Sequence, residues 1–307
     1  MKILLQTPPE RADEWRAALA AAMPEEAVAV WPDAPATPDY ALVWKPPADL
    51  FVRARPTRAI FNLGAGVDGL MNVPTLPDDV PVIRLEDAGM AEQMADYVTF
   101  AVLRAYREMD AYAAQQREAI WRTRPIIAKK TFGVGFLGFG VLGNAIARTL
   151  LPFGFPLYAW SSTRKAAPGV VSYAGLAELH EFLAKARVLA CLLPATADTA
   201  SLLDRAALQT LPPGAHLINV ARGGIVVDED LIALLDNGHL AGATLDVFRE
   251  EPLPREHPFW RHPRIALTPH VSAVTLIEDS IAQIAAKIRR LERGEPVSGV
   301  VDRVRGY

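Results

Sequence analysis

The sequence has little of several features that mark specialised protein classes. Its only cysteine, Cys191, lies in an apolar run, so no internal disulfide can form and we expect a buried, unreactive thiol. No apolar run approaches the ~20 residues of a membrane span, and the short apolar start lacks the length of a signal peptide. A net charge of −3 creates no broad positive field. We therefore expect a cytoplasmic protein without membrane or nucleic-acid partners, and we predict no metal site.

The length and composition favour a globular chain with two domains. A chain of 307 residues exceeds what one hydrophobic core usually organises. Hydrophobic residues make up 51% and charged residues 22%, which excludes a largely disordered protein.

Short apolar runs alternate with helical patterns in two series, which is typical of βαβ units with parallel sheets. The first series predicts strands near residues 3–6, 28–31, 41–44, 59–63 and 82–84. The second predicts strands near 132–137, 156–160, 188–193, 216–220, 242–245 and 265–267. Between the series, residues 90–117 contain no Pro or Gly, so we expect one long helix there. A last helix should bury the face of Ile277, Ile281, Ile284, Ile288 and Leu291 and end at Gly294.

The pattern Gly-x-Gly-x-x-Gly begins at Gly64, at Gly133 and at Gly138. A dinucleotide-binding turn needs a strand before it and, after it, a helix whose N-terminal amides receive the pyrophosphate. Only the third copy, Gly138, Gly140 and Gly143, has both, although a tight turn without a ligand is the alternative. The first copy could instead point the amides of Ala65 and Gly66 at a carboxylate, or be a simple turn.

The end of the strand after the glycine turn indicates which dinucleotide binds. An acid usually stands there and binds the ribose hydroxyls of NAD. Here Ser161 lies 18 residues after Gly143, and Arg164 and Lys165 follow. Hydroxyls and cations suit a 2′-phosphate, so NADPH is preferred and NADH stays possible; the alternative is a solvated charged turn.

Three further side chains stand at or just beyond predicted strand ends. Arg222 follows strand 216–220, Glu251 lies beyond 242–245, and His270 follows 265–267. Because open parallel sheets bind ligands at one edge, we expect these side chains at one site. Arg222 could hold a carboxylate and a carbonyl oxygen, His270 could donate a proton, and Glu251 would favour the protonated imidazole. Taken singly, His270 could be a packing or capping residue and Arg222 a surface cation.

Together these residues resemble the D-isomer-specific 2-hydroxyacid dehydrogenases, and within them the glyoxylate/hydroxypyruvate reductase A group. The resemblance covers nearly the whole chain and is carried by segments 63–68, 138–143, 160–165, 193–194, 221–223, 246–252, 269–271 and 301–307. It implies two doubly wound parallel-sheet domains: a flavodoxin-like substrate domain, residues 1–97 and 270–307, and a Rossmann cofactor domain, residues 98–269.

The resemblance also implies the site residues and the reaction. Arg222, Glu251 and His270 would be catalytic, with NADPH delivering hydride and His270 the proton to glyoxylate or hydroxypyruvate. The substrate would contact Trp44, Ala65, Gly66, Arg222 and His270. The cofactor would contact Gly138, Gly140, Val141, Leu142, Gly143, Ser161, Arg164, Lys165, Leu193, Pro194, Val220, Ala221 and Asp246. A homodimer would form through the long helix region. From its position alone, we hypothesise that Trp121 reaches the partner's active site.

Two other functions fit part of this pattern. A dinucleotide-sensing binding protein is one, because the family includes corepressors, although Arg222, Glu251 and His270 favour an enzyme. A dehydrogenase for a bulkier 2-keto acid is the other. Assays of several 2-keto acids with both cofactors distinguish these functions.

Overall fold

The chain folds into two compact units. The computed structural model describes residues 1–33 and 35–306, so Tyr307, the last residue of the C-terminal segment noted above, lies outside the described residues. One unit contains residues 1–90 and 274–307, and the other contains residues 91–273. The expected borders, 97/98 and 269/270, lie a few residues away. His270 therefore falls in the second unit rather than in the first.

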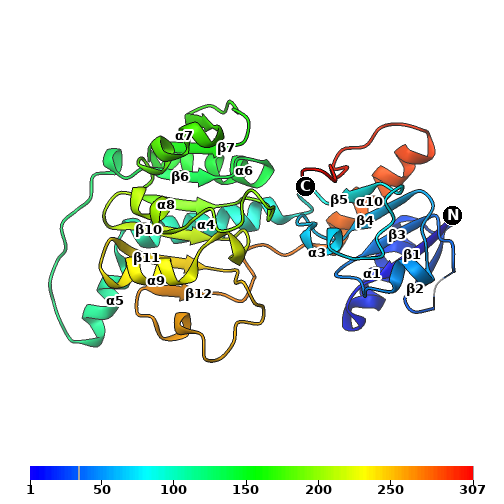
Figure 1. The fold of residues 1–307 in the computed structure, drawn as a ribbon, viewed down its shortest axis with the longest axis horizontal. Helices are drawn as coiled ribbons and strands as arrows, with labels where there is room; N and C mark the ends of the chain where they lie inside the picture. Colours follow the sequence, from blue (N-terminus) through cyan, green and yellow to red (C-terminus); the bar gives the residue numbers. More distant parts are fainter. Residues whose placement is uncertain (34, 307) are drawn as a thin grey trace. The chain divides into compact units, whose positions relative to one another are not determined.

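The first unit is built on a five-stranded parallel sheet with the order β2-β1-β3-β4-β5, the order of flavodoxin-like folds. The strands are β1 (Lys2–Gln6), β2 (Ala27–Val30), β3 (Tyr40–Val43), β4 (Ala59–Asn62) and β5 (Val82–Arg84). Its helices are α1 (Ala12–Ala22), α2 (Leu50–Arg53), α3 (Asp68–Met71) and α10 (Ile277–Glu292). Figure 1 shows α10, the C-terminal helix, within the unit formed by the N-terminal residues.

Alternate residues of β3 contact different layers of the first unit. Ala41 and Val43 pack in one cluster with residues of α2 and α3. Tyr40, on the other face, donates a hydrogen bond of 2.6 Å to Glu292 at the end of α10. Successive side chains of a strand point to opposite faces of the sheet, so helices cover both faces. The predicted face of α10 is buried at Ile281, Ile284 and Ile288, and Gly294 follows the helix with a φ of 71°.

The second unit is built on a seven-stranded parallel sheet with the order β12-β11-β10-β9-β6-β7-β8. The strands are β6 (Val134–Leu137), β7 (Leu157–Ser161), β8 (Val170–Ala174), β9 (Val188–Cys191), β10 (Ala215–Asn219), β11 (Leu240–Leu245) and β12 (Ile265–Leu267). Strand β8 is an addition to the expected strands. Because β6 lies between β7 and β9, the direction of strand addition reverses beside it, and ligands bind at such a point in open α/β sheets.

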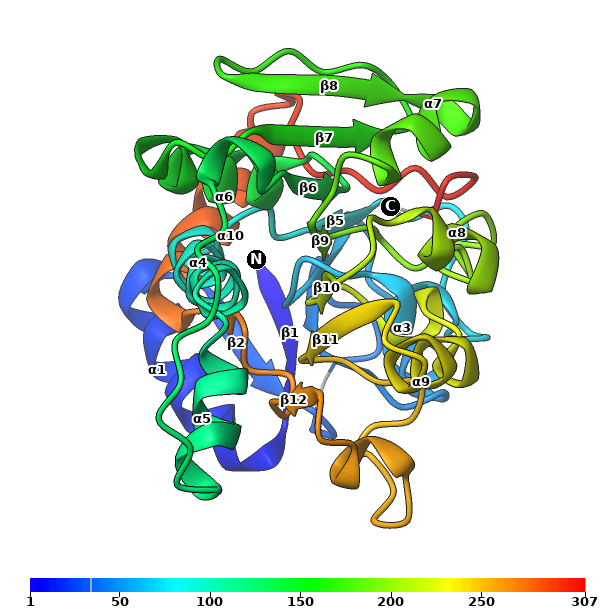
Figure 2. The same ribbon diagram turned by 90° about the vertical axis from the view of Figure 1, so that its left-hand side faces the viewer.

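Helices cover both faces of the seven-stranded sheet. Residues of α4 (Met90–Tyr106) and α6 (Val141–Leu150) pack in the core on one face. Residues of α7 (Gly175–Leu183), α8 (Arg205–Thr210) and α9 (Asp228–Asp236) pack in the core on the other. Figure 2 shows these two helix layers on either side of the strands. The two parallel sheets with their helices confirm the expected doubly wound α/β class.

The prediction of one long helix over residues 90–117 was wrong. Helix α4 ends at Tyr106, and α5 (Met109–Arg117) starts anew after Glu108, whose φ of 52° is left-handed. Arg104 donates to the Asp110 carboxylate at 2.8 Å, and Glu108 accepts from Arg124 at 2.6 Å. These ion pairs hold the break without a Pro or Gly.

Cys191 is buried at the end of β9, and burial raises the pKa of its thiol to about 12. Within residues 1–33 and 35–306, no helix has the length and apolar character that a membrane crossing needs.

Candidate active site

Each of the three glycines after β6 has a distinct environment. Gly138 has a φ of 104°, and a Cβ there would lie 2.8 Å from the carbonyl carbon of Leu192, which follows β9. A Cβ on Gly143 would lie 2.7 Å from the Gly138 oxygen, so this glycine allows the helix to approach the turn. Gly140, the N-cap of α6, has no atom within 4 Å of an added Cβ. The turn is therefore tight at two glycines and open at the middle one, where a pyrophosphate would approach the backbone.

The end of β7 carries hydroxyls and cations. Ser161 is buried and donates to the Thr163 oxygen at 2.7 Å, while Lys165 is exposed. Arg164 is exposed and forms an ion pair with Glu178 of α7. Exposed pairs contribute only about 0–1 kcal/mol, so this pair leaves the guanidinium available for exchange to a phosphate.

The turn that carries Arg222 packs directly on the turn that leads to Glu251. Asn219, the last residue of β10, accepts from the Ala221 amide at 3.1 Å and donates to the Arg222 oxygen at 3.1 Å. A Cβ on Gly223 would lie 1.9 Å from the carbonyl carbon of Phe248. Glycine is therefore required beside Arg222 for the two turns to touch.

His270 and Glu251 form a hydrogen-bonded pair. The Nδ1 atom of His270 lies 2.8 Å from Oε2 of Glu251, and Oε1 of Glu251 accepts from the Phe248 amide at 3.0 Å. The His270 side chain is 42% exposed, so the ring also faces solvent. Because an ionised carboxylate only accepts hydrogen bonds, Nδ1 carries the proton between the two residues, and Nε2 points elsewhere.

Strands β10, β11 and β12 are neighbours, so the loops after them meet at one edge of the sheet. The loops that carry Arg222, Glu251 and His270 lie at this edge, where His270 contacts Glu251. A guanidinium that can bind a carboxylate, and an imidazole held by a carboxylate, are groups that binding and protonating a small oxo acid would need.

The remaining expected residues lie as follows. Leu193, which is buried, and Pro194, which is partly buried, follow β9. Val220 and Ala221 are buried after β10, and Leu142 is partly buried in α6. Val141 is exposed at the start of α6. Asp246 is fully buried and accepts hydrogen bonds from the loop around His270. Trp121 is fully exposed in the segment after α5.

The other expected substrate contacts lie in the first unit, after β3 and β4. Asn62 donates to the oxygens of Gly64 at 2.8 Å and Gly66 at 3.0 Å and so holds the loop that includes Ala65. A Cβ on Gly64 would lie 2.3 Å from the ring of Trp44, so this glycine lets the indole pack against the loop.

Sequence reasoning did not assign roles to four residues that hold the site: Tyr97, Asn219, Gly223 and Thr268. Asn219 and Gly223 lie on either side of Arg222. The glycine directly after this candidate arginine is the sequence feature from which a role for Gly223 could have been inferred. Tyr97 and Thr268 are 171 residues apart, and nothing local in the sequence connects them.

Comparisons with known proteins identify the family of the chain. The family model of the D-isomer specific 2-hydroxyacid dehydrogenase, NAD binding domain, matches residues 99–272. A glyoxylate/hydroxypyruvate reductase A of Salmonella newport is 46% identical, with all of both chains covered.

Two solved structures extend the likeness over the whole chain. A D-isomer specific 2-hydroxyacid dehydrogenase from Xanthobacter autotrophicus Py2, in complex with NADPH and MES, is 40% identical with a TM-score of 0.94 and covers 100% of this chain and 99% of its own. The NADPH-dependent glyoxylate/hydroxypyruvate reductase of Sinorhizobium meliloti, in complex with NADP and sulfate, is 35% identical with a TM-score of 0.92 and the same coverage. The chain therefore belongs to the D-isomer specific 2-hydroxyacid dehydrogenase family of NAD(P)-dependent oxidoreductases.

Proposed function

We propose that this chain uses NADPH to reduce small 2-keto acids, glyoxylate to glycolate and hydroxypyruvate to D-glycerate. The observation that carries the proposal is the 2.8 Å contact between His270 and Glu251 beside the Arg222 turn. The names of the relatives, glyoxylate/hydroxypyruvate reductases, support the substrate class.

The residues after β6 and β7 fit the cofactor. The open space at Gly140 accommodates a pyrophosphate, and residues 161–165 at the end of β7 include no acid. A 2′-phosphate would displace Glu178 of α7 from Arg164. Arg164 and Lys165 would hold that phosphate. When bound, NADPH supplies the hydride for the reaction.

The protein residues bind the acid and deliver the proton. Arg222 would hold the substrate carboxylate and polarise its carbonyl group. Because Nδ1 of His270 is directed at Glu251, Nε2 is the nitrogen that donates the proton to the carbonyl oxygen. Glu251 stabilises the protonated ring before the transfer, and the Phe248 amide fixes that carboxylate.

The test is an assay of glyoxylate, hydroxypyruvate, pyruvate and larger 2-keto acids with NADPH and NADH in parallel, following absorbance at 340 nm. We expect turnover of the two small acids with NADPH, and a loss of at least about 100-fold in His270→Ala, the usual scale of general acid catalysis. Cofactor binding without turnover of any acid would identify a dinucleotide-sensing protein instead. Preference for larger acids would identify a dehydrogenase of different specificity.

We also propose that the protein is a homodimer formed through α4, α5 and the segment that follows them. Large apolar side chains are exposed there: Phe100, Met109, Ile120, Trp121 and Ile126. The segment also borders a cavity of about 630 Å³. A second copy would cover these side chains, and Trp121 would reach the partner's active site. Light scattering should give twice the monomer mass, and Trp121→Asp with Ile126→Asp should give the monomer mass; a monomeric wild type contradicts the proposal.

A further inference from the structure

One residue, Asp246, holds three successive amides of the loop that carries His270. Its backbone oxygen accepts from the His270 amide at 2.9 Å. Its carboxylate accepts from the Val271 and Ser272 amides, each at 2.8 Å. The φ of His270 is 56°, a left-handed conformation that costs a non-glycine residue about 1 kcal/mol or more and persists only where its surroundings hold it.

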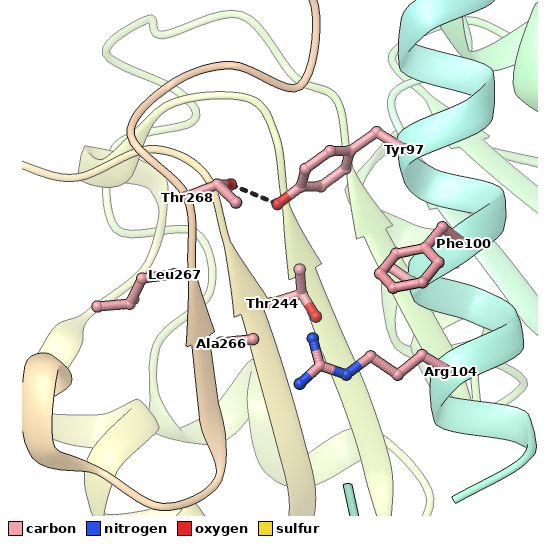
Figure 3. Close-up of a pocket in the computed structure, with 8 residues that line it drawn as sticks. Tyr97, Phe100, Arg104, Thr244, Ala266, Leu267 and Thr268 are labelled. Carbon is pink, nitrogen blue, oxygen red and sulfur yellow. Dashed lines mark hydrogen bonds between the residues drawn. The ribbon is translucent and has the colours of Figure 1, made fainter. Parts of the chain in front are cut away.

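The hydroxyls of Thr268 and Tyr97 continue this set of hydrogen bonds from Asp246 to helix α4. Thr268 donates to the Asp246 carboxylate at 2.6 Å, because a carboxylate can only accept. The hydroxyl of Tyr97 lies 2.5 Å from the same threonine oxygen, whose hydrogen is already used, so Tyr97 is the donor. Burial raises the pKa of Tyr97 and keeps its proton in place. Figure 3 shows Tyr97 reaching from α4 toward Thr268, just beyond β12.

The Thr268 side chain is not closely packed on every side. A cavity of about 80 Å³ lies beside the two hydroxyls, bordered by Phe100, Arg104 and the end of β12 (Figure 3). The Thr268 amide is held by the Leu245 oxygen at 3.0 Å, but the cavity leaves its side chain room to rotate unless hydrogen bonds restrain the hydroxyl. The orientation of the Thr268 hydroxyl therefore depends on its hydrogen bonds with Tyr97 and Asp246.

We propose that Tyr97 and Thr268 are positioning residues for His270. The hydroxyl of Tyr97 orients that of Thr268, Thr268 orients the buried carboxylate of Asp246, and Asp246 holds the imidazole in the place from which it donates its proton. This inference rests on the proposed function, because it takes His270 as the proton donor.

The experiment compares Thr268→Val, Thr268→Ser and Tyr97→Phe with wild type. The matched control is Tyr106→Phe, which removes a hydroxyl of the same helix that donates to the Ile127 oxygen at 3.0 Å. A lost hydrogen bond to a charged group contributes on the scale of tenfold in rate. We expect about a tenfold lower kcat for Thr268→Val, a smaller loss for Tyr97→Phe, and near-normal values for Thr268→Ser and Tyr106→Phe.

Two readouts separate positioning from a general loss of folded protein. The isotope effect on kcat with C4-deuterated NADPH should rise in Thr268→Val and Tyr97→Phe, because the transfer step becomes slower relative to product release. In the protein without cofactor, the ¹⁵N imidazole signal of His270, assigned with His270→Gln, should broaden or double in these two variants only.

Wild-type isotope effects and imidazole signals in both Thr268→Val and Tyr97→Phe would overturn the inference, as would an equal loss in Thr268→Ser. If Thr268→Val does not fold, the isotope effect and the imidazole signal of Tyr97→Phe test the inference by themselves. Failure of wild type to turn over any 2-keto acid instead removes the proposed function, while the NMR comparison still tests whether the hydroxyls order the loop.

Discussion

The contact of Gly223 with Phe248 predicts a sharp effect of adding a single methyl group. An ordinary carbon contact begins near 3.4 Å, whereas the Cβ of Gly223→Ala would lie 1.9 Å from the Phe248 carbonyl carbon and 2.3 Å from the Arg249 nitrogen. Both are backbone atoms, so the turns must separate by about 1 Å or more, and overpacking of this kind costs about 1–3 kcal/mol of stability. The separation moves Arg222 away from Glu251 and His270.

A displacement of about 1 Å in a catalytic group can lower the rate by about 100-fold. We therefore expect kcat/KM for glyoxylate, at saturating NADPH, to fall by about that factor in Gly223→Ala. The adjacent Gly224→Ala is the matched control, because a Cβ there meets no atom within 4 Å. Unfolding in urea measures the stability of both variants, so kinetic and stability losses can be compared. Activity within about threefold of wild type in Gly223→Ala, or an equal loss in Gly224→Ala, refutes the reasoning.

Three other predictions each follow from the surroundings of one residue. Gly140→Ala should leave the free energy of unfolding nearly unchanged, because its Cβ meets no atom within 4 Å, yet weaken NADPH binding in a fluorescence titration; unaltered affinity contradicts the pyrophosphate contact. Arg164→Ala should raise the Kd of NADPH about tenfold and leave that of NADH unchanged, since a charge-assisted bond to the phosphate is lost; equal effects on both cofactors exclude this role. Burial lowers the pKa of His216 from 6.5 to about 4, so the folded state resists its protonation. Stability should be full above about pH 6.5 and fall by about 3 kcal/mol toward pH 4, and His216→Gln should remove this part of the pH dependence in urea unfolding.

Local sequence patterns predicted the parts of the fold that depend on residues close together in the chain. The alternation of apolar runs and helical segments predicted both sheets, and the strand and helix around Gly138 selected one glycine pattern from three. Glu251 and His270 could be placed together because loops after neighbouring parallel strands share an edge, which topology supplies without any side-chain detail.

Features that depend on distant contacts could not be predicted in this way. The break at Glu108 has no Pro or Gly, and besides the local Arg104–Asp110 pair it is held by an ion pair between Glu108 and Arg124, which lies beyond α5. Likewise, the ion pair of Arg164 with Glu178 and the contact of Tyr97 with Thr268 join segments that only the folded sheet brings together.

The central claim is that the protein transfers a hydride to a 2-keto acid while His270 supplies the proton. A single-turnover reaction of glyoxylate with NADPH deuterated at the transferred C4 position tests it directly, with the product analysed by mass spectrometry and NMR. We predict glycolate with one deuterium on C2 from wild type, and at least about 100-fold slower formation of the same product in His270→Ala. Glycolate without deuterium, or an undiminished rate in His270→Ala, would contradict this account.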